Sequence, residues 1–148
     1  MTKELKFPGV ELATKIFGCW PSFHDAEIRW LKMDRAGIED EHGPTVEFLI
    51  HCFEMTKKIS SSGHFTLEKH TLVHFRFRKV NDLHLRDFNQ QNAIFGLQIE
   101  DESDPSWEER FFKTKIEGSF GIYGSFHSRS VEILSAIPCD ENGEPITK

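Results

Sequence analysis

The chain has 148 residues, with 18 Lys and Arg against 24 Asp and Glu, so its formal net charge is −6. This length fits one domain that can bury a hydrophobic core without disulfides or a structural metal. The acidic balance argues against nucleic acid and anionic membranes as partners, because both attract cationic surfaces, and it favours a basic protein partner.

Three cysteines, Cys19, Cys52 and Cys139, are far apart and form no CxxC or other zinc-binding spacing. A sparse, odd count is typical of a reducing compartment. The first residues lack the apolar core of a signal peptide, and no apolar run is long enough to cross a bilayer. We therefore expect a cytoplasmic protein.

One short helix is predicted at the start of the chain. Apolar residues three and four apart predict a helix over residues 10–17, and Gly18 followed by Pro21 ends it. Strands are predicted after it, from alternation of apolar and polar residues. Their ranges are 26–35, 45–55, 71–79, 93–100, 107–117, 120–126 and 131–137.

The segments between these strands are short or irregular. Residues 56–69 are expected to form a mobile loop or a long hairpin tip, and residues 80–92 a non-regular connection. Gly118, Gly121 and Gly124 predict bulges or close approaches of the backbone.

No link contains a second helix of crossover length, so the pattern predicts an α+β fold: a short N-terminal helix followed by a mostly antiparallel, curved sheet of six to seven strands. Residues 1–148 are expected to form a single domain, with about 139–148 as a flexible acidic tail.

The first candidate for chemistry is the cluster His24, Asp25 and Glu27. In an extended segment, Asp25 and Glu27 project to one side and His24 to the other. A metal-assisted hydrolase built on this cluster would need ligands from elsewhere, such as His51, His70 or His74. We favour a structural role, with Asp25 as a buried hydrogen-bond acceptor in a turn and His24 bonded to a buried carbonyl beside Trp20. No HExxH, HxH or CxxC spacing supports a ligand set.

Two other patterns favour structural roles. Cys52 follows His51, but neighbours in a strand point to opposite faces and cannot act as nucleophile and base together. A basic strand face could bind phosphate or stack on bases, yet it is more simply an outer face paired with acids on adjacent strands. Its residues are His70, His74, Arg76 and Arg78.

Two segments resemble the signature of the immunity protein 50 family. Residues 17–27 read FGCWPSFHDAE, and residues 85–94 read LRDFNQQNAI, with Asp87 where the family has a small residue or glycine. The resemblance covers nearly the whole chain. The motif positions are Trp20, Phe23, His24, Asp25, Glu27, Asn89, Gln90 and Asn92. We expect them to hold the helix-to-sheet junction and the mid-chain connection.

The resemblance implies a non-catalytic protein, without cofactor or metal, that binds and neutralises a cognate toxin of a bacterial polymorphic toxin system. Acidic residues are the expected partner-binding face, which would suit the basic site of a nuclease toxin. They are Glu39, Asp40, Glu41, Asp101, Glu102 and Asp104. The alternatives are the hydrolase above and a small-ligand-binding domain without catalysis. An exposed sheet edge would also allow a homodimer.

Overall fold

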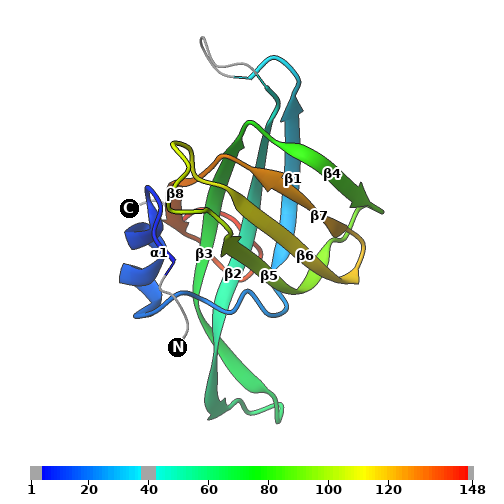
Figure 1. Ribbon diagram of the computed structural model, residues 1–148. Coiled ribbons are helices and arrows are strands. Elements are labelled where there is room, and N and C mark those ends of the chain that lie inside the picture. The colour runs from blue at the N-terminus through cyan, green and yellow to red at the C-terminus, as the bar shows by residue number, and fades with distance from the viewer. Residues whose placement is uncertain (1–4, 38–42, 147–148) are drawn as a thin grey trace.

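The computed structural model describes residues 5–37 and 43–146. These residues form one helix and eight strands in one antiparallel sheet (Figure 1). In chain order the elements are α1 (Val10–Phe17), β1 (Glu27–Asp34), β2 (Thr45–Ile59), β3 (Phe65–Arg78), β4 (Asn81–Arg86), β5 (Ala93–Asp101), β6 (Phe112–Phe120), β7 (Tyr123–Ser128) and β8 (Ser130–Pro138). The predicted α+β class is confirmed.

The prediction of six to seven strands is wrong, because the described residues contain eight. The additional strand is β4, which lies within the segment predicted to be non-regular. β4 is at the edge of the sheet, pairs with β7, and is exposed over most of its length. Because Leu85 is the residue of this edge strand that packs against the core, its sequence lacks the full apolar alternation that marks the buried strands.

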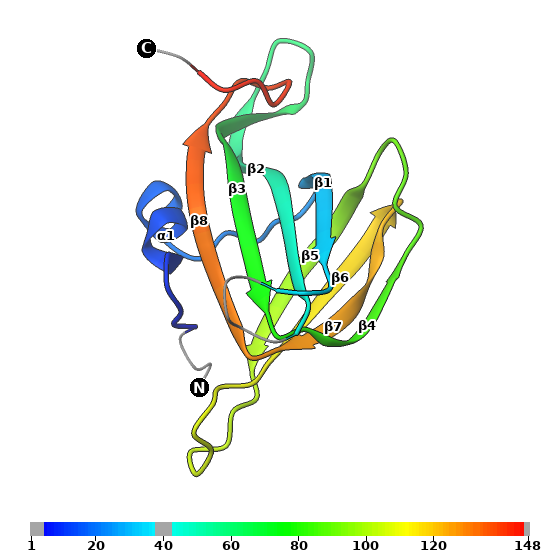
Figure 2. The same cartoon turned by 90° about the horizontal axis from the view of Figure 1, so that it is seen from above.

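The strand order is β4-β7-β6-β5-β1-β2-β3-β8. Two four-stranded halves meet where β1 pairs with β5, at the single register position Glu27 opposite Ala93. Figure 2 shows the two halves turned toward each other about this junction. The curvature lets the apolar inner faces of both halves share one core.

Phenylalanine rings from both halves fill that core. The ring centroid of Phe75 in β3 lies 5.2 Å from that of Phe48 in β2. Phe77 reaches across to Phe126 of β7, at 4.8 Å and nearly perpendicular. Edge-to-face contacts of this kind add to the free energy gained by burying the rings.

Helix α1 lies beside β8, at one side of the sheet (Figure 2). Ala13 and Phe17 provide its buried face. The backbone enters the helix at Gly9, where a Cβ would lie 2.1 Å from the carbonyl oxygen of Ile133 in β8, so only glycine fits. Among the described residues, no helix is long and apolar enough to cross a membrane.

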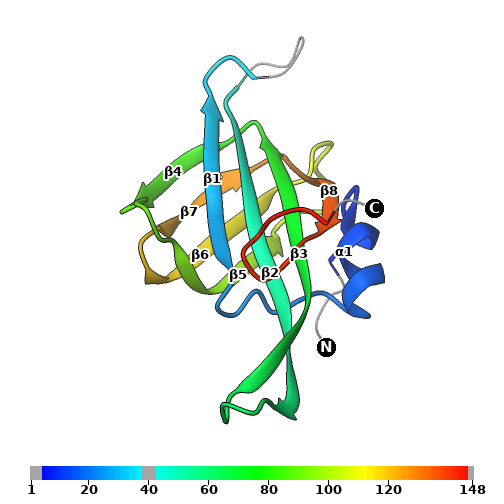
Figure 3. The ribbon, with the colours of Figure 1, turned by 180° about the vertical axis from the view of Figure 1, so that it is seen from behind.

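Residues 139–146, within the segment predicted as a flexible tail, form a hydrogen-bonded turn after β8. Cys139 is buried and forms a β-bridge with Pro145, and the amides of Asn142 and Glu144 each donate to the Asp140 carboxylate at 2.9 Å. Figure 3 shows this C-terminal loop lying across the outer face of β2 and β3. The sequence Asp-Glu-Asn-Gly is a turn signal, and here it folds residues 139–146 back onto the sheet.

The close approaches predicted for the glycines of β6 and β7 are confirmed, and Gly124 is the tightest. A Cβ there would lie 1.8 Å from the carbonyl oxygen of His84 in β4, and its φ is +145°. Gly124→Ala should therefore displace β4 and lower the free energy of unfolding by about 2–4 kcal/mol, measured by urea denaturation.

Gly18→Ala is the matched control for backbone strain alone, because φ is +79° and no atom lies within 4 Å of the added Cβ. It should cost about 1 kcal/mol. An equal loss for both variants would contradict the predicted clash with β4.

Candidate functional site

The segment between α1 and β1 carries the first motif and is anchored in the core. α1 ends at Phe17 and is capped by Gly18, which adopts a left-handed backbone conformation and donates its amide to the carbonyl oxygen of Thr14 at 2.7 Å. The Trp20 ring packs edge-on against Phe23 at 5.3 Å and against Phe75 of β3 at 6.2 Å. The aromatic residues of the motif thus fix where the chain passes from helix to sheet.

Two residues of this segment adopt left-handed backbone conformations, Phe23 at φ 58° and Asp25 at φ 64°. The turn directs the Asp25 amide to the carbonyl oxygen of Ile94, at 2.9 Å, and the Ile94 amide donates to Ala26, also at 2.9 Å. These bonds extend the short pairing between β1 and β5. The motif backbone therefore helps to hold the two halves of the sheet together.

His24 and Asp25 are exposed, and their side chains face each other with 3.1 Å between Nδ1 and Oδ2. The predictions of a buried Asp25 acceptor and of a His24 bond to a buried carbonyl are therefore wrong. The turn directs the Phe23 ring into the core and leaves the next two side chains in solvent. An exposed ion pair of this kind contributes little to stability.

Asn92, in the second motif, is buried and uses both ends of its side-chain amide. Its Oδ1 accepts from the amides of Asn89 at 3.0 Å and Ile122 at 3.1 Å, and its Nδ2 donates to the carbonyl oxygen of Asn89 at 2.7 Å. Its own carbonyl oxygen accepts from the Ile28 amide at 3.0 Å. One residue therefore connects β1, the start of β5 and the β6–β7 turn.

The remaining residues of the second motif lie around Asn92. The Asn89 side chain accepts from the Gln91 amide at 2.8 Å and shapes the loop, while Gln90 is exposed. Gly121 allows the β6–β7 turn to approach, because a Cβ there would lie 2.7 Å from Asn92 Oδ1. The two motifs, at residues 17–27 and 85–94, thus meet at the β1–β5 junction.

A pocket of about 590 Å³ opens beside this junction, between the β2–β3 hairpin and the C-terminal loop. Its lining residues are Asp25, Glu27, His51, Phe53, Thr66, Leu67, His70, Glu141 and Asn142. His51 Nε2 and His70 Nδ1 are 2.9 Å apart. Burial lowers the pKa of His51, and the charges of His70 and Arg29 lower it further against an opposing effect of Asp140.

The structure brings some of the candidate metal ligands together and separates others. Asp25 and Glu27 share the pocket with His51 and His70, whereas His74 is paired with Glu47 on the outer sheet face. Within residues 5–37 and 43–146, no group of three His, Cys, Asp or Glu side chains is arranged to hold a metal ion.

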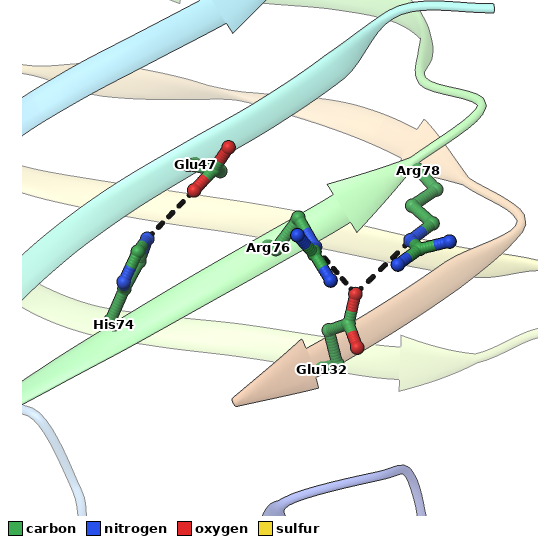
Figure 4. Close-up of polar contacts among 5 residues, drawn as sticks. All are labelled: Glu47, His74, Arg76, Arg78 and Glu132. Carbon is green, nitrogen blue, oxygen red and sulfur yellow. Dashed lines mark hydrogen bonds and ion pairs between the residues drawn. The ribbon is translucent and has the colours of Figure 1, made fainter. Parts of the chain in front are cut away.

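Three of the four residues of the basic strand face are paired with acids, as Figure 4 shows. His74 Nε2 lies 2.8 Å from Glu47 Oε1, and Glu132 Oε1 accepts from Arg76 at 2.6 Å and from Arg78 at 3.1 Å. Burial raises the pKa of Glu132, but the two guanidinium groups outweigh it and leave the pKa below its ordinary value. These side chains pair across β2, β3 and β8, which matches the simpler interpretation of this face. His70 is the exception, because it contacts His51 and lines the pocket.

The acidic loop between β5 and β6 uses part of its charge internally. Asp101 Oδ2 accepts from Arg110 at 2.8 Å and Oδ1 from the Ser103 amide at 3.0 Å. Burial raises the pKa of Asp101, yet these bonds lower it to about 2 overall. Asp104 accepts from Ser106, and Glu102 is exposed. Glu39, Asp40 and Glu41 lie outside the described residues.

Cys52 belongs to the core. It is fully buried among the inner-face side chains of β2, and burial raises the pKa of its thiol to about 12. A thiol with that pKa stays protonated at neutral pH and is a poor nucleophile.

One family model matches the chain, that of a family described as immunity protein 50, over residues 10–138. No curated protein and no solved structure matches it.

Asn92→Ala should lower the free energy of unfolding, because the amides of Asn89 and Ile122 lose their shared acceptor. The expected cost is about 1–3 kcal/mol, because the buried Ile122 amide is left without an acceptor, and urea denaturation measures it. Gln90→Ala is the matched control in the same motif, since Gln90 is exposed, and should change stability by less than about 0.5 kcal/mol. If both variants unfold at the same urea concentration, Asn92 does not hold the junction.

The burial of His51 beside His70 predicts that the protein loses stability in mild acid. The pKa of His51 is lower in the folded protein than in the unfolded chain, so the unfolded chain binds the proton more readily. Neutral His51 therefore adds its full share to the free energy of unfolding above the ordinary histidine pKa of about 6.5, and this share is lost as the pH falls toward the lowered pKa. The melting temperature should drop between pH 7 and pH 5.5. His51→Gln should flatten that drop, whereas His84→Gln, at an exposed position in β4, should not. Identical slopes in both variants would exclude His51 as the cause.

Proposed function

Since this chain belongs to the immunity protein 50 family, we propose that it is a non-catalytic immunity protein that binds a cognate bacterial toxin and neutralises it in the cytoplasm. The observation that carries the proposal is the extent of the family match. Residues 10–138 run from the first residue of α1 to the last residue of β8, so the match spans every described helix and strand.

The architecture suits a protein inhibitor. The aromatic core and the Asn92 hydrogen bonds fix the relative positions of the sheet halves, so surface loops are held in place before a partner arrives. A preformed surface avoids the entropy cost of ordering on binding, which favours tight complexes.

In this proposal, the acidic β5–β6 loop attracts the toxin and orients it during encounter. Glu102, Asp104 and Glu108 are exposed on the loop, while Asp101 is committed to Arg110. Exposed rim charges act mainly on the rate of encounter, and their effect weakens as salt screens them. We therefore assign this loop to the approach of a basic toxin surface.

The test is a calorimetric titration with the product of the gene immediately upstream of the one that encodes this chain, together with co-expression of the two proteins. Nanomolar binding and rescue of cell growth are expected, because immunity requires occupancy at low cellular concentrations. Stopped-flow association should slow as salt is raised from 50 to 500 mM, since the loop charges are screened.

Absence of both binding and rescue would overturn the proposal. Tight binding with an association rate independent of salt would leave immunity standing and remove the steering role from the β5–β6 loop.

A further inference from the structure

The β2–β3 hairpin extends beyond the rest of the sheet as an arm, defined here as residues 54–69. β1 pairs with β2 only as far as His51, and β8 pairs with β3 only as far as Thr71. Beyond these positions the two strands pair with each other alone. The base of the arm still borders the body, where Leu67 lines the pocket described above, and Figures 1 and 3 show the outer end of the hairpin projecting away from the rest of the sheet. A two-stranded ribbon is only marginally stable in water, so the arm adds little to the fold itself.

Four large apolar side chains are exposed along this arm. Met55 is 50 % exposed, Ile59 68 %, Phe65 55 % and Leu67 40 %. Met55 pairs with Leu67 and Ile59 with Phe65, and directly opposed residues project to the same face of a ladder. Phe65 and Leu67 are two residues apart in β3 and so project to one face, although β2 is irregular between Met55 and Ile59. The two pairs therefore place four apolar side chains along the arm, and we call them the apolar stripe. Exposed stripes of this kind mark interaction sites.

The charge of the arm tip is opposite to that of the whole chain. Residues 56–66 contain Lys57, Lys58 and His64 but no Asp or Glu, whereas the complete chain has a net charge of −6. At the base of the arm, Lys69 is already paired with Glu54 at 2.8 Å. The apolar stripe is therefore accompanied by cationic side chains at its outer end. Two such tips would repel each other, which disfavours a symmetric tip-to-tip contact with a second copy of this chain.

We propose that the arm is the segment that enters the partner, and that the partner is the toxin. Ile59 and Phe65 fill an apolar groove on the toxin, and carboxylates on the rim of that groove pair with Lys57 and Lys58. This inference rests on the proposed function and divides the binding work: the β5–β6 loop guides approach, and the arm provides the buried contact.

The experiment compares two double variants in titrations against the same upstream gene product. Ile59→Ser with Phe65→Ser removes the outer half of the stripe. Ile146→Ser with Phe120→Ser is the matched control, because these side chains are 55 % and 57 % exposed and lie outside the arm. The arm variant should raise the dissociation constant at least about 30-fold, the scale of an interface hot spot, and the control by less than about threefold. Melting temperatures should stay near the wild-type value for both.

A third variant tests the electrostatic half of the inference. Lys57→Glu with Lys58→Glu should also weaken binding at least tenfold, because the reversed charges would face the carboxylates of the groove rim. Hydrogen exchange should show residues 54–69 protected in the complex.

Each contrary result separates the two levels of the proposal. If the arm variant binds the toxin as tightly as the wild type does, the proposed role of the arm is overturned and the proposed immunity function stands. No binding by the wild type would overturn both. A wild-type dimer in light scattering that becomes a monomer in the arm variant would reassign the stripe to self-association.

Discussion

The fold depends on a short contact between β1 and β5, where two four-stranded half-sheets meet with one register pair. So little strand pairing leaves backbone donors and acceptors that need other partners. Asn92 supplies them from its buried amide, and the left-handed turn at Phe23 and Asp25 supplies them from the main chain. Both devices lie in segments whose polar and aromatic residues stand out in the sequence.

The central strands could be predicted because alternation reflects burial of one face. Thr71, Val73, Phe75 and Phe77 follow that rule, and all four are buried. β4 was not predicted, because an edge strand has no face that must be apolar throughout. The exposure of Asp25 was not predicted for a different reason. The conformation of the turn decides on which side of the backbone a side chain lies, and residue composition does not contain that information.

The candidate site was partly predictable for the same reasons. Asp25, Glu27, His51 and His70 could be named as possible neighbours by residue type, and the pocket does contain them. The C-terminal loop that closes one side of it could not be foreseen, because its docking depends on contacts such as the Arg29 hydrogen bond to Asn142 at 3.1 Å. Long-range contacts between loops leave no periodic signal in a sequence.

The strand order also determines when this chain can fold during its synthesis. β8 pairs with β3, and Val131 lies opposite Phe77, more than 50 residues earlier in the chain. The half-sheet that supports α1 therefore remains incomplete until the last strand has left the ribosome. Topologies dominated by such distant pairings fold in milliseconds to seconds, so a newly made molecule stays incompletely folded for that time. Under the proposed function, copies of the protein that folded earlier would have to bind the toxin during that time.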